Sequence, residues 1–209
     1  MNAILPDAGA FQVGTFVKTT SPQVIEILGG SGLDFAVLDA EHAPWDRAAL
    51  DLAMIAGRAV ALPLFVRVEE RSAARLLSVL DMGATGVLVP HVDSEQDARE
   101  VVAHCRYVGG DRGYSSSPRA AGYGVLGMQQ AIAQGDRNVV VCQIESVAAV
   151  EAAARIAAVP GVAALFIGRA DLALSMGLDN AQAPAVLDAT EQVVRAALAA
   201  GKAAGMFVG

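Results

Sequence analysis

Two carboxylates follow consecutive apolar runs in the second half of the chain. The run 139–144 is followed directly by Glu145, and the run 162–167 is followed four residues later by Asp171. If both runs are strands of one parallel sheet, the two carboxylates lie at its carboxyl edge, where hard oxygen ligands suit Mg²⁺ or Mn²⁺. Each carboxylate could instead cap or charge the first turn of the following helix. The spacing therefore predicts a metal site and leaves the capping alternative open.

A histidine with two acidic neighbours follows an earlier apolar run. Residues 35–38 predict a buried strand, and Asp39, Glu41 and His42 come directly after it. A nearby carboxylate orients an imidazole and raises its basicity, as a general base near neutral pH requires. A single loop histidine is often an ordinary surface residue, but the acidic cluster favours a catalytic role for His42.

One cation ends an otherwise apolar strand. Arg67 closes the run 62–66, where a solvated charge would be badly placed. Its guanidinium suits a substrate carboxylate or a developing enolate oxygen, and an internal ion pair is the equally weighted alternative. His91 also follows a predicted strand but lacks acidic neighbours, so it is interpreted as a loop residue. His104 lies inside a predicted helix and is interpreted as structural.

These candidates depend on strands that alternate with helices along the whole chain. Strands are predicted near residues 13–18, 35–38, 62–66, 86–89, 138–144, 162–167 and 203–208. Strands that are apolar throughout and separated by helices indicate a parallel sheet covered on both faces. Polar residues after nearly every strand favour a (β/α)₈ TIM barrel over a doubly wound sheet, and no GxGxxG follows the first strand. We expect a single barrel domain over residues 1–209, with about seven βα units and without its C-terminal portion.

Composition narrows the classes of partner. The net charge of −7 argues against a nucleic-acid partner and against an anionic membrane surface. No apolar stretch reaches the roughly 18 residues of a membrane-spanning helix. Residues 1–7 lack the basic segment of a secretory signal, so a cytoplasmic protein is expected. Cys105 and Cys142 are too few for a disulfide scaffold or a cysteine metal site.

Taken together, the motifs resemble the class II, metal-dependent pyruvate aldolases. That family includes 4-hydroxy-2-oxoheptanedioate and 2-dehydro-3-deoxyglucarate aldolases and is related to the citrate lyase β-chain. The matching segments, in the family's order, are 38–44 (LDAEHAP), 66–68 (VRV), 80–84 (LDMGA), 87–90 (VLVP), 112–115 (RGYS), 119–120 (RA), 143–145 (QIE) and 166–172 (FIGRADL). One such motif is weak evidence, but the ordered set covers nearly the whole chain.

The resemblance implies catalytic roles for three residues. His42 would be the base, and Arg67 would bind the 2-oxo acid and its enolate. Asp81 would match the aspartate that increases the basicity of the histidine. Since Asp81 is predicted at a helix end, on the opposite side of the barrel from His42, such a contact is expected to cross a subunit interface. Arg169 departs from the family, because many members have proline there.

The resemblance also implies a cofactor and partners. Glu145 and Asp171 would hold a divalent cation, Mg²⁺ or Mn²⁺ with Co²⁺ as a further candidate. Gln143, Asp171 and the backbone of Ala170 would contact the substrate, together with Arg67. The partners would be a small 2-oxo acid, an aldehyde and further copies of the chain, in a trimer or hexamer.

The implied reaction is cleavage of a 4-hydroxy-2-oxo acid to pyruvate and an aldehyde, together with the reverse aldol addition. A citrate lyase-like enzyme acting on an acyl-CoA thioester is one alternative, although the sequence contains no basic cluster for a nucleotide. A truncated relative without catalytic activity is the other alternative.

Overall fold

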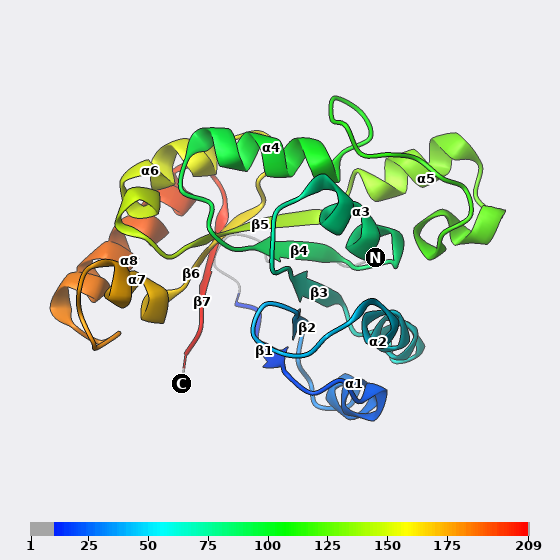
Figure 1. Cartoon of the computed structure of the whole chain (residues 1–209), viewed down its shortest axis with the longest axis horizontal. Coiled ribbons are helices and arrows are strands. Elements are labelled where there is room, and N and C mark those ends of the chain that lie inside the picture. Colours follow the sequence, from blue (N-terminus) through cyan, green and yellow to red (C-terminus); the bar gives the residue numbers. More distant parts are fainter. Residues whose placement is uncertain (1–10, 209) are drawn as a thin grey trace. The chain divides into compact units, whose positions relative to one another are not determined.

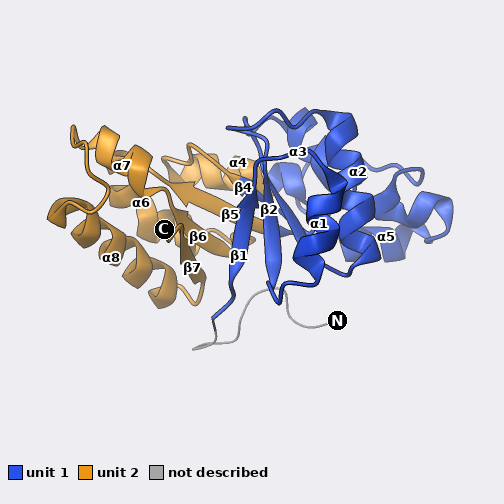
Figure 2. Cartoon of the chain, turned by 90° about the horizontal axis from the view of Figure 1, so that it is seen from below, with its two compact units in different colours: residues 1–88, 103–139 blue, residues 89–102, 140–209 orange. Residues whose placement is uncertain are grey.

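The computed structural model describes residues 11–208, which form two compact units (Figure 2). Unit 1 contains the described residues up to Leu88 and residues 103–139, and unit 2 contains residues 89–102 and 140–208. The N-terminal segment interpreted above as lacking a signal lies outside the described residues. The expectation of one domain over residues 1–209 stays a prediction.

Unit 1 is built from strands and helices in strict alternation. In chain order these are β1 (Gly14–Val17), α1 (Pro22–Gly29), β2 (Phe35–Asp39), α2 (Arg47–Ala59), β3 (Leu64–Arg67), α3 (Ala73–Asp81) and β4 (Gly86–Val89) (Figure 1). The strands are parallel in the order β1-β2-β3-β4, with Asp39 opposite Arg67. The final residues of β2 and β3 therefore lie side by side at the carboxyl edge of the sheet.

Two further elements complete unit 1. They are the 3₁₀ helix η1 (Arg119–Gly124) and α5 (Met128–Gly135), which follow α4 (Glu95–Cys105). The sequence predicts neither helix nor strand at α5. The N–H of Val139 donates to the carbonyl of Thr85 at 3.1 Å, so β5 starts beside the start of β4 within this unit.

Unit 2 repeats the same alternation. Its elements are β5 (Val139–Ile144), α6 (Val147–Ala158), β6 (Ala164–Ile167), α7 (Arg169–Ser175), α8 (Pro184–Ala199) and β7 (Ala203–Met206). The first residue of β5, Val139, belongs to unit 1. The strands are parallel in the order β5-β6-β7. The carboxyl ends of β5 and β6 are adjacent, because Ile144 pairs with Ile167.

The helices begin where the sequence places capping residues. Asp46 precedes α2, and its carboxylate accepts a hydrogen bond from the Ala49 N–H at 2.8 Å. Ser146 precedes α6, and its hydroxyl accepts from the Ala149 N–H at 3.0 Å. Such caps satisfy N–H groups that have no partner within the helix. They also define the short loops between strand and helix in which the candidate residues lie.

The α/β class and the parallel arrangement of the strands are confirmed. All seven predicted strands occur among residues 11–208. Strands β3 and β4 are buried over their whole length. Closure into a (β/α)₈ barrel stays a prediction. None of the helices over residues 11–208 combines the length and the apolar composition needed to cross a bilayer.

Candidate active site

Charged side chains gather at the carboxyl ends of the first three strands of unit 1. Lys18 follows β1, Asp39 ends β2, Glu41 and His42 lie in the turn after β2, and Arg67 ends β3. We refer to these five residues as the Asp39 cluster. The parallel register places all five at the same edge of the sheet.

Asp39 and Arg67 form a buried, bidentate ion pair. Arg67 donates from Nε to Oδ1 of Asp39 at 2.9 Å and from Nη2 to Oδ2 at 2.8 Å. Asp39 is 0% exposed and Arg67 9% exposed. The Arg67 guanidinium also lies 3.2 Å, through Nε, from Oε2 of Glu41 and 5.0 Å above the ring of Phe16. The internal ion pair that the sequence left open is therefore present, and it fixes the guanidinium in one orientation.

The surroundings of Asp39 keep its carboxyl ionised. Burial on its own raises the pKa of Asp39, but the hydrogen bond and the charge of Arg67 lower it, and the His42 N–H and the Lys18 charge add to this lowering. The net effect is a pKa below the usual value for aspartate. Lys18 contributes through Nζ, 3.5 Å from Oδ2 of Asp39. The Asp39 carboxylate thus stays ionised at neutral pH.

His42 is held through its backbone, and its ring extends toward solvent. Its N–H donates to Oδ1 of Asp39 at 3.2 Å, while its side chain is 55% exposed. The ring nitrogen Nε2 lies 3.8 Å from Oε2 of Glu41. An exposed imidazole beside a carboxylate has the geometry of a general base that can reach a small molecule.

A buried tryptophan fixes the turn that carries His42. The indole N–H of Trp45 donates to the Val17 carbonyl at the end of β1, at 2.9 Å. Asp46, the next residue, caps α2. The turn between β2 and α2 is therefore fixed at its C-terminal end by two hydrogen bonds, and His42 has a defined position.

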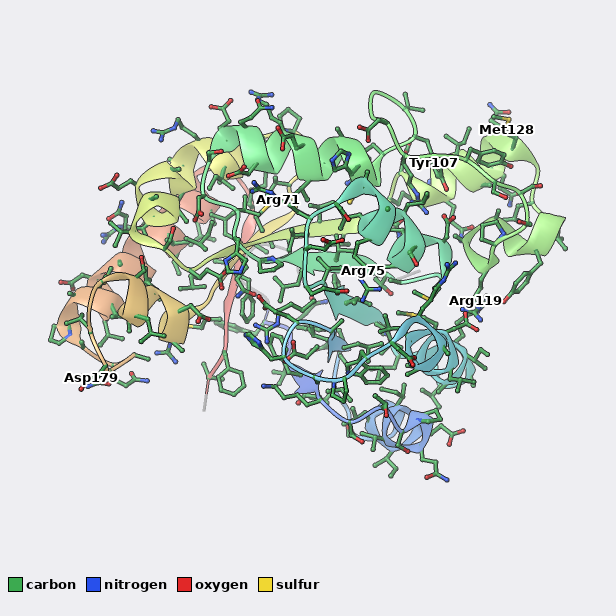
Figure 3. The ribbon with its side chains drawn as sticks, in the orientation of Figure 1. Arg71, Arg75, Tyr107, Arg119, Met128 and Asp179 are labelled. Atoms are coloured by element: carbon green, nitrogen blue, oxygen red, sulfur yellow. The ribbon has the colours of Figure 1, made fainter. Side chains whose placement is uncertain are left out.

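Asp81 lies at the other end of the strands from His42. It ends α3, before β4 begins, and its Oδ1 accepts from Nη2 of the buried Arg112 at 3.1 Å. The Arg112 guanidinium also donates to Oδ1 of Asn138 at 3.0 Å and lies 4.4 Å above the ring of Tyr107, which Figure 3 labels. Within unit 1, Asp81 is thus paired with an arginine and does not reach His42.

A second group of polar residues surrounds Glu145 in unit 2. We refer to His91, Gln143, Glu145 and Gly168 as the Glu145 cluster. Glu145 follows β5 and is 4% exposed, and Gln143 within β5 is buried. Oε1 of Glu145 accepts from the backbone N–H of His91 at 2.8 Å and lies 3.0 Å from Nδ1 of the same histidine. Oε2 accepts from Nε2 of Gln143.

Gly168 brings the next loop against this carboxylate. A Cβ at position 168 would lie 3.1 Å from both Cβ and Oε2 of Glu145 and 3.2 Å from Nε2 of Gln143. Gly168 is also the residue before α7, and the Leu172 N–H donates to its carbonyl at 2.9 Å. Asp171, which is exposed, lies in the first turn of α7, so it belongs to the helix that starts beside Glu145.

Neither carboxylate occupies the cap position of a helix, but Asp171 lies in the first turn of α7, which the alternative also allowed. Ser146 caps α6, and Gly168 occupies the cap position of α7. Glu145 is instead directed to His91 and Gln143, and Asp171 lies inside α7. Ala170 is in the same first turn of α7, where its backbone precedes that of Asp171.

The chemistry of the Glu145 cluster fits a hard divalent cation. Glu145 is a buried anion, and within the described residues no lysine or arginine forms an ion pair with it. Oε1 of Gln143 is buried and has no hydrogen-bond partner among those residues. Both features are costly unless a further group satisfies them. Residues 11–208 hold no cluster of three or more metal-binding side chains, so a cation would also take ligands from water or substrate.

Three residues of these clusters were missed by sequence reasoning. Lys18 and His91 follow β1 and β4, so position after a strand was a signal for both. Gly168 acts through its lack of a side chain, which the sequence shows but does not explain. Cys105 and Cys142 are both buried, and burial raises the pKa of Cys105 to about 12, which keeps that thiol protonated.

Comparison with known proteins gives consistent results. The model of a family described as HpcH/HpaI aldolase/citrate lyase matches residues 12–208. A 5-keto-4-deoxy-D-glucarate aldolase from Salmonella arizonae is 36% identical over 216 residues, which cover 99% of this chain and 84% of the relative. Two solved structures are similar. An HpcH/HpaI aldolase/citrate lyase family protein from Burkholderia cenocepacia has a TM-score of 0.89, is 33% identical, and is matched over 95% of this chain and 80% of its own. An HpcH/HpaI aldolase from Desulfitobacterium hafniense has a TM-score of 0.90, is 29% identical, and is matched over 96% of this chain and 79% of its own.

Proposed function

Because the chain belongs to the HpcH/HpaI aldolase/citrate lyase family, we propose that it is a metal-dependent aldolase that cleaves 4-hydroxy-2-oxo acids to pyruvate and an aldehyde. The same enzyme would catalyse the reverse aldol addition. The observation that carries the proposal is the buried Glu145 carboxylate beside the unsatisfied amide oxygen of Gln143. A buried carboxylate of this kind suits the hard divalent cation that the proposed reaction would use.

The cation would be Mg²⁺, Mn²⁺ or Co²⁺, held by Glu145 and Asp171. When bound, it supplies Lewis acidity that stabilises negative charge on the 2-oxo acid as the carbon–carbon bond breaks. Gln143 and the backbone of Ala170 would orient the 2-oxo acid. The burial of Gln143 supports its role, because the buried amide holds its free oxygen in a fixed direction, where it can accept a hydrogen bond from a substrate hydroxyl group or from a water.

Proton transfer would belong to His42. Its imidazole accepts the proton of the 4-hydroxyl group while the bond between C3 and C4 breaks, and the aldehyde is released. A proton is then returned to C3 of the remaining three-carbon fragment, which gives pyruvate. Glu41 supports this assignment, since its carboxylate at 3.8 Å stabilises the imidazolium that forms.

Arg67 would bind the substrate with the part of its guanidinium that Asp39 does not use. Nε and Nη2 donate to Asp39, and Nη1 remains for the carboxylate or the enolate oxygen of the 2-oxo acid. Asp81 could act on His42 only from a second copy of the chain, because within one copy it pairs with Arg112. We therefore propose a homo-oligomer.

The chain would form a single (β/α)₈-type domain. The alternation of seven parallel strands with helices and the family match over residues 12–208 support this proposal. Scanning calorimetry tests it: a calorimetric enthalpy equal to the van't Hoff enthalpy is expected for one cooperative domain. Two resolved transitions would contradict it.

The proposed reaction is tested by assaying pyruvate. Incubation with 5-keto-4-deoxy-D-glucarate and Mn²⁺ is expected to release pyruvate, which lactate dehydrogenase converts to lactate with loss of NADH absorbance. Release should fall to background after treatment with EDTA and return when Mn²⁺ is added in excess. Turnover that EDTA does not affect would contradict the metal role. Inhibition by free CoA, or cleavage of a CoA thioester instead, would favour the citrate lyase-like alternative.

A further inference from the structure

His91 adopts a backbone conformation that its side chain does not favour. Its φ angle is +55°, and Ala61 and Tyr123 are the other two non-glycine residues with positive φ in the described chain. This left-handed region disfavours residues with a Cβ, and glycine or asparagine is the usual choice there. The His91 side chain is 70% exposed, so core packing does not explain why histidine occupies the position. Strain of this kind often marks a functional constraint.

The strained conformation directs two groups of His91 to one oxygen atom. The backbone N–H donates to Oε1 of Glu145 at 2.8 Å, and the ring atom Nδ1 lies 3.0 Å from the same oxygen. The ring and the backbone of His91 thus lie against the same side of the Glu145 carboxylate. Gln143 donates to the other oxygen, Oε2. Glu145 therefore accepts one hydrogen bond on each oxygen, and the His91 ring makes a further close contact with Oε1.

These two hydrogen bonds and the ring contact leave one open acceptor position on the carboxylate. An ionised carboxylate has about two lone-pair positions on each oxygen. The His91 N–H takes one position on Oε1, the His91 ring atom Nδ1 blocks the other at 3.0 Å, and Gln143 takes one position on Oε2. The position that remains is on Oε2, the oxygen that also faces the backbone of Gly168 at the start of the loop to Asp171.

We propose that His91 is a positioning residue that restricts Glu145 to binding a cation through Oε2 alone. This inference rests on the proposed metal-dependent function and deepens it, because it concerns which cation the site accepts. Mg²⁺ and Mn²⁺ take six ligands in octahedral geometry and suit a carboxylate that binds through one oxygen. Ca²⁺ takes more ligands and often uses both oxygens of a carboxylate. His91 thus selects against Ca²⁺ by occupying the second oxygen.

The decisive variant is His91→Gly, because it separates this role from a structural one. Glycine removes the ring but retains the backbone N–H, and it relieves the positive φ angle. The melting temperature of the metal-free variant is expected to rise by about 2–4 °C, which corresponds to relief of about 1 kcal/mol in a chain of this size. The affinity for Mn²⁺, measured by calorimetric titration, is expected to fall by about 10-fold. A residue with only a structural role would not raise stability and weaken binding together.

Two further variants serve as controls. Ala61→Gly relieves the same positive φ angle at an exposed position, so it should raise the melting temperature and leave Mn²⁺ affinity unchanged. His91→Asn tolerates the left-handed region and places an amide N–H₂ near the position of Nδ1, so it should retain most of the affinity. The ratio of Mg²⁺ affinity to Ca²⁺ affinity should fall in His91→Gly and be largely restored in His91→Asn.

The outcomes separate this inference from the proposed function. Unchanged Mn²⁺ affinity and cation preference in His91→Gly, with binding intact in the wild-type protein, would overturn the role of His91 alone. A larger loss of affinity for Co²⁺ and Zn²⁺ than for Mg²⁺ would also overturn it, because it would make the imidazole a direct ligand. Absence of cation binding by the wild-type protein would overturn both. Cation binding with the expected pattern but without pyruvate release would support His91 and contradict the aldolase proposal.

Discussion

Replacing Glu145 with glutamine is expected to lower metal-dependent pyruvate release by at least ~100-fold. Mutating a residue that only hydrogen-bonds a metal ligand already lowers metal affinity or activity by about 10–100-fold, and Glu145 would be a ligand itself. Glutamine has the same shape and retains an acceptor oxygen for the His91 N–H, so unit 2 should remain folded. The substitution removes the negative charge that would hold the cation. Titration with Mn²⁺ should show the loss of binding directly, and circular dichroism should show an unchanged fold.

A matched control lies in the following helix. Glu151→Gln in α6 changes an exposed carboxylate of the same unit in the same way and should retain both Mn²⁺ binding and activity. Full Mn²⁺ affinity in Glu145→Gln would remove Glu145 from the metal site. Activity that is lost in both variants would indicate damage to α6 and would give no support to a specific role for Glu145.

Replacing Asp39 with asparagine is expected to lower the free energy of unfolding by about 3–5 kcal/mol, the usual cost of removing one partner from a buried ion pair. The variant leaves the buried Arg67 guanidinium with Glu41 as its remaining close anion. It also weakens the acceptor for the His42 N–H, so the turn that carries the base loses part of its support. Urea denaturation measures the first effect, and kcat for pyruvate release measures the second.

The same pair makes the size of this loss depend on pH. Because the pKa of folded Asp39 is below the unfolded value of 3.8, its contribution to stability is fully present above that value and is lost as pH falls through the folded pKa. The difference in unfolding free energy between the wild-type protein and Asp39→Asn should therefore be constant near neutral pH and shrink in acid. Asp179, labelled in Figure 3, is an exposed aspartate between α7 and α8. The Asp179→Asn variant should show no such difference. A difference that is as large in acid, at the lowest pH at which both proteins still fold, as it is at neutral pH would contradict the assignment to the Asp39–Arg67 pair.

The sequence predicted the strands well because burial on both faces leaves a clear signal. Runs such as 86–89 and 162–167 contain apolar residues on both faces, which a half-exposed strand would not tolerate. Asp46 before α2 and Ser146 before α6 are residue types that commonly cap helices. The helix α5 was not predicted. It follows residues 107–123, which are rich in Gly and Ser. It includes only a short amphipathic stretch, 128–135, whose burial depends on tertiary contacts.

The sequence predicted which residues belong to the candidate site, but it did not predict which of their side chains contact one another. Position after a strand identified Glu145, Asp171, His42 and Arg67, because strand ends in parallel sheets lie at one edge. Which side chains contact each other depends on register, and the bidentate bond between Asp39 and Arg67 follows from their pairing across β2 and β3. The Glu145 hydrogen bond to His91 spans 54 residues and depends on a positive φ angle, which no local pattern reveals.

The indole ring of Trp45, which donates a hydrogen bond to the Val17 carbonyl, is an intrinsic fluorescent probe. Trp45 is the single tryptophan of the chain, it is buried, and it lies three residues after His42. Indole emission shifts to longer wavelength when the ring becomes exposed to water. Fluorescence excited near 295 nm therefore reports on the histidine-bearing turn without any added label. Ligand screening and stopped-flow measurements on this region could follow that one signal in the unmodified protein.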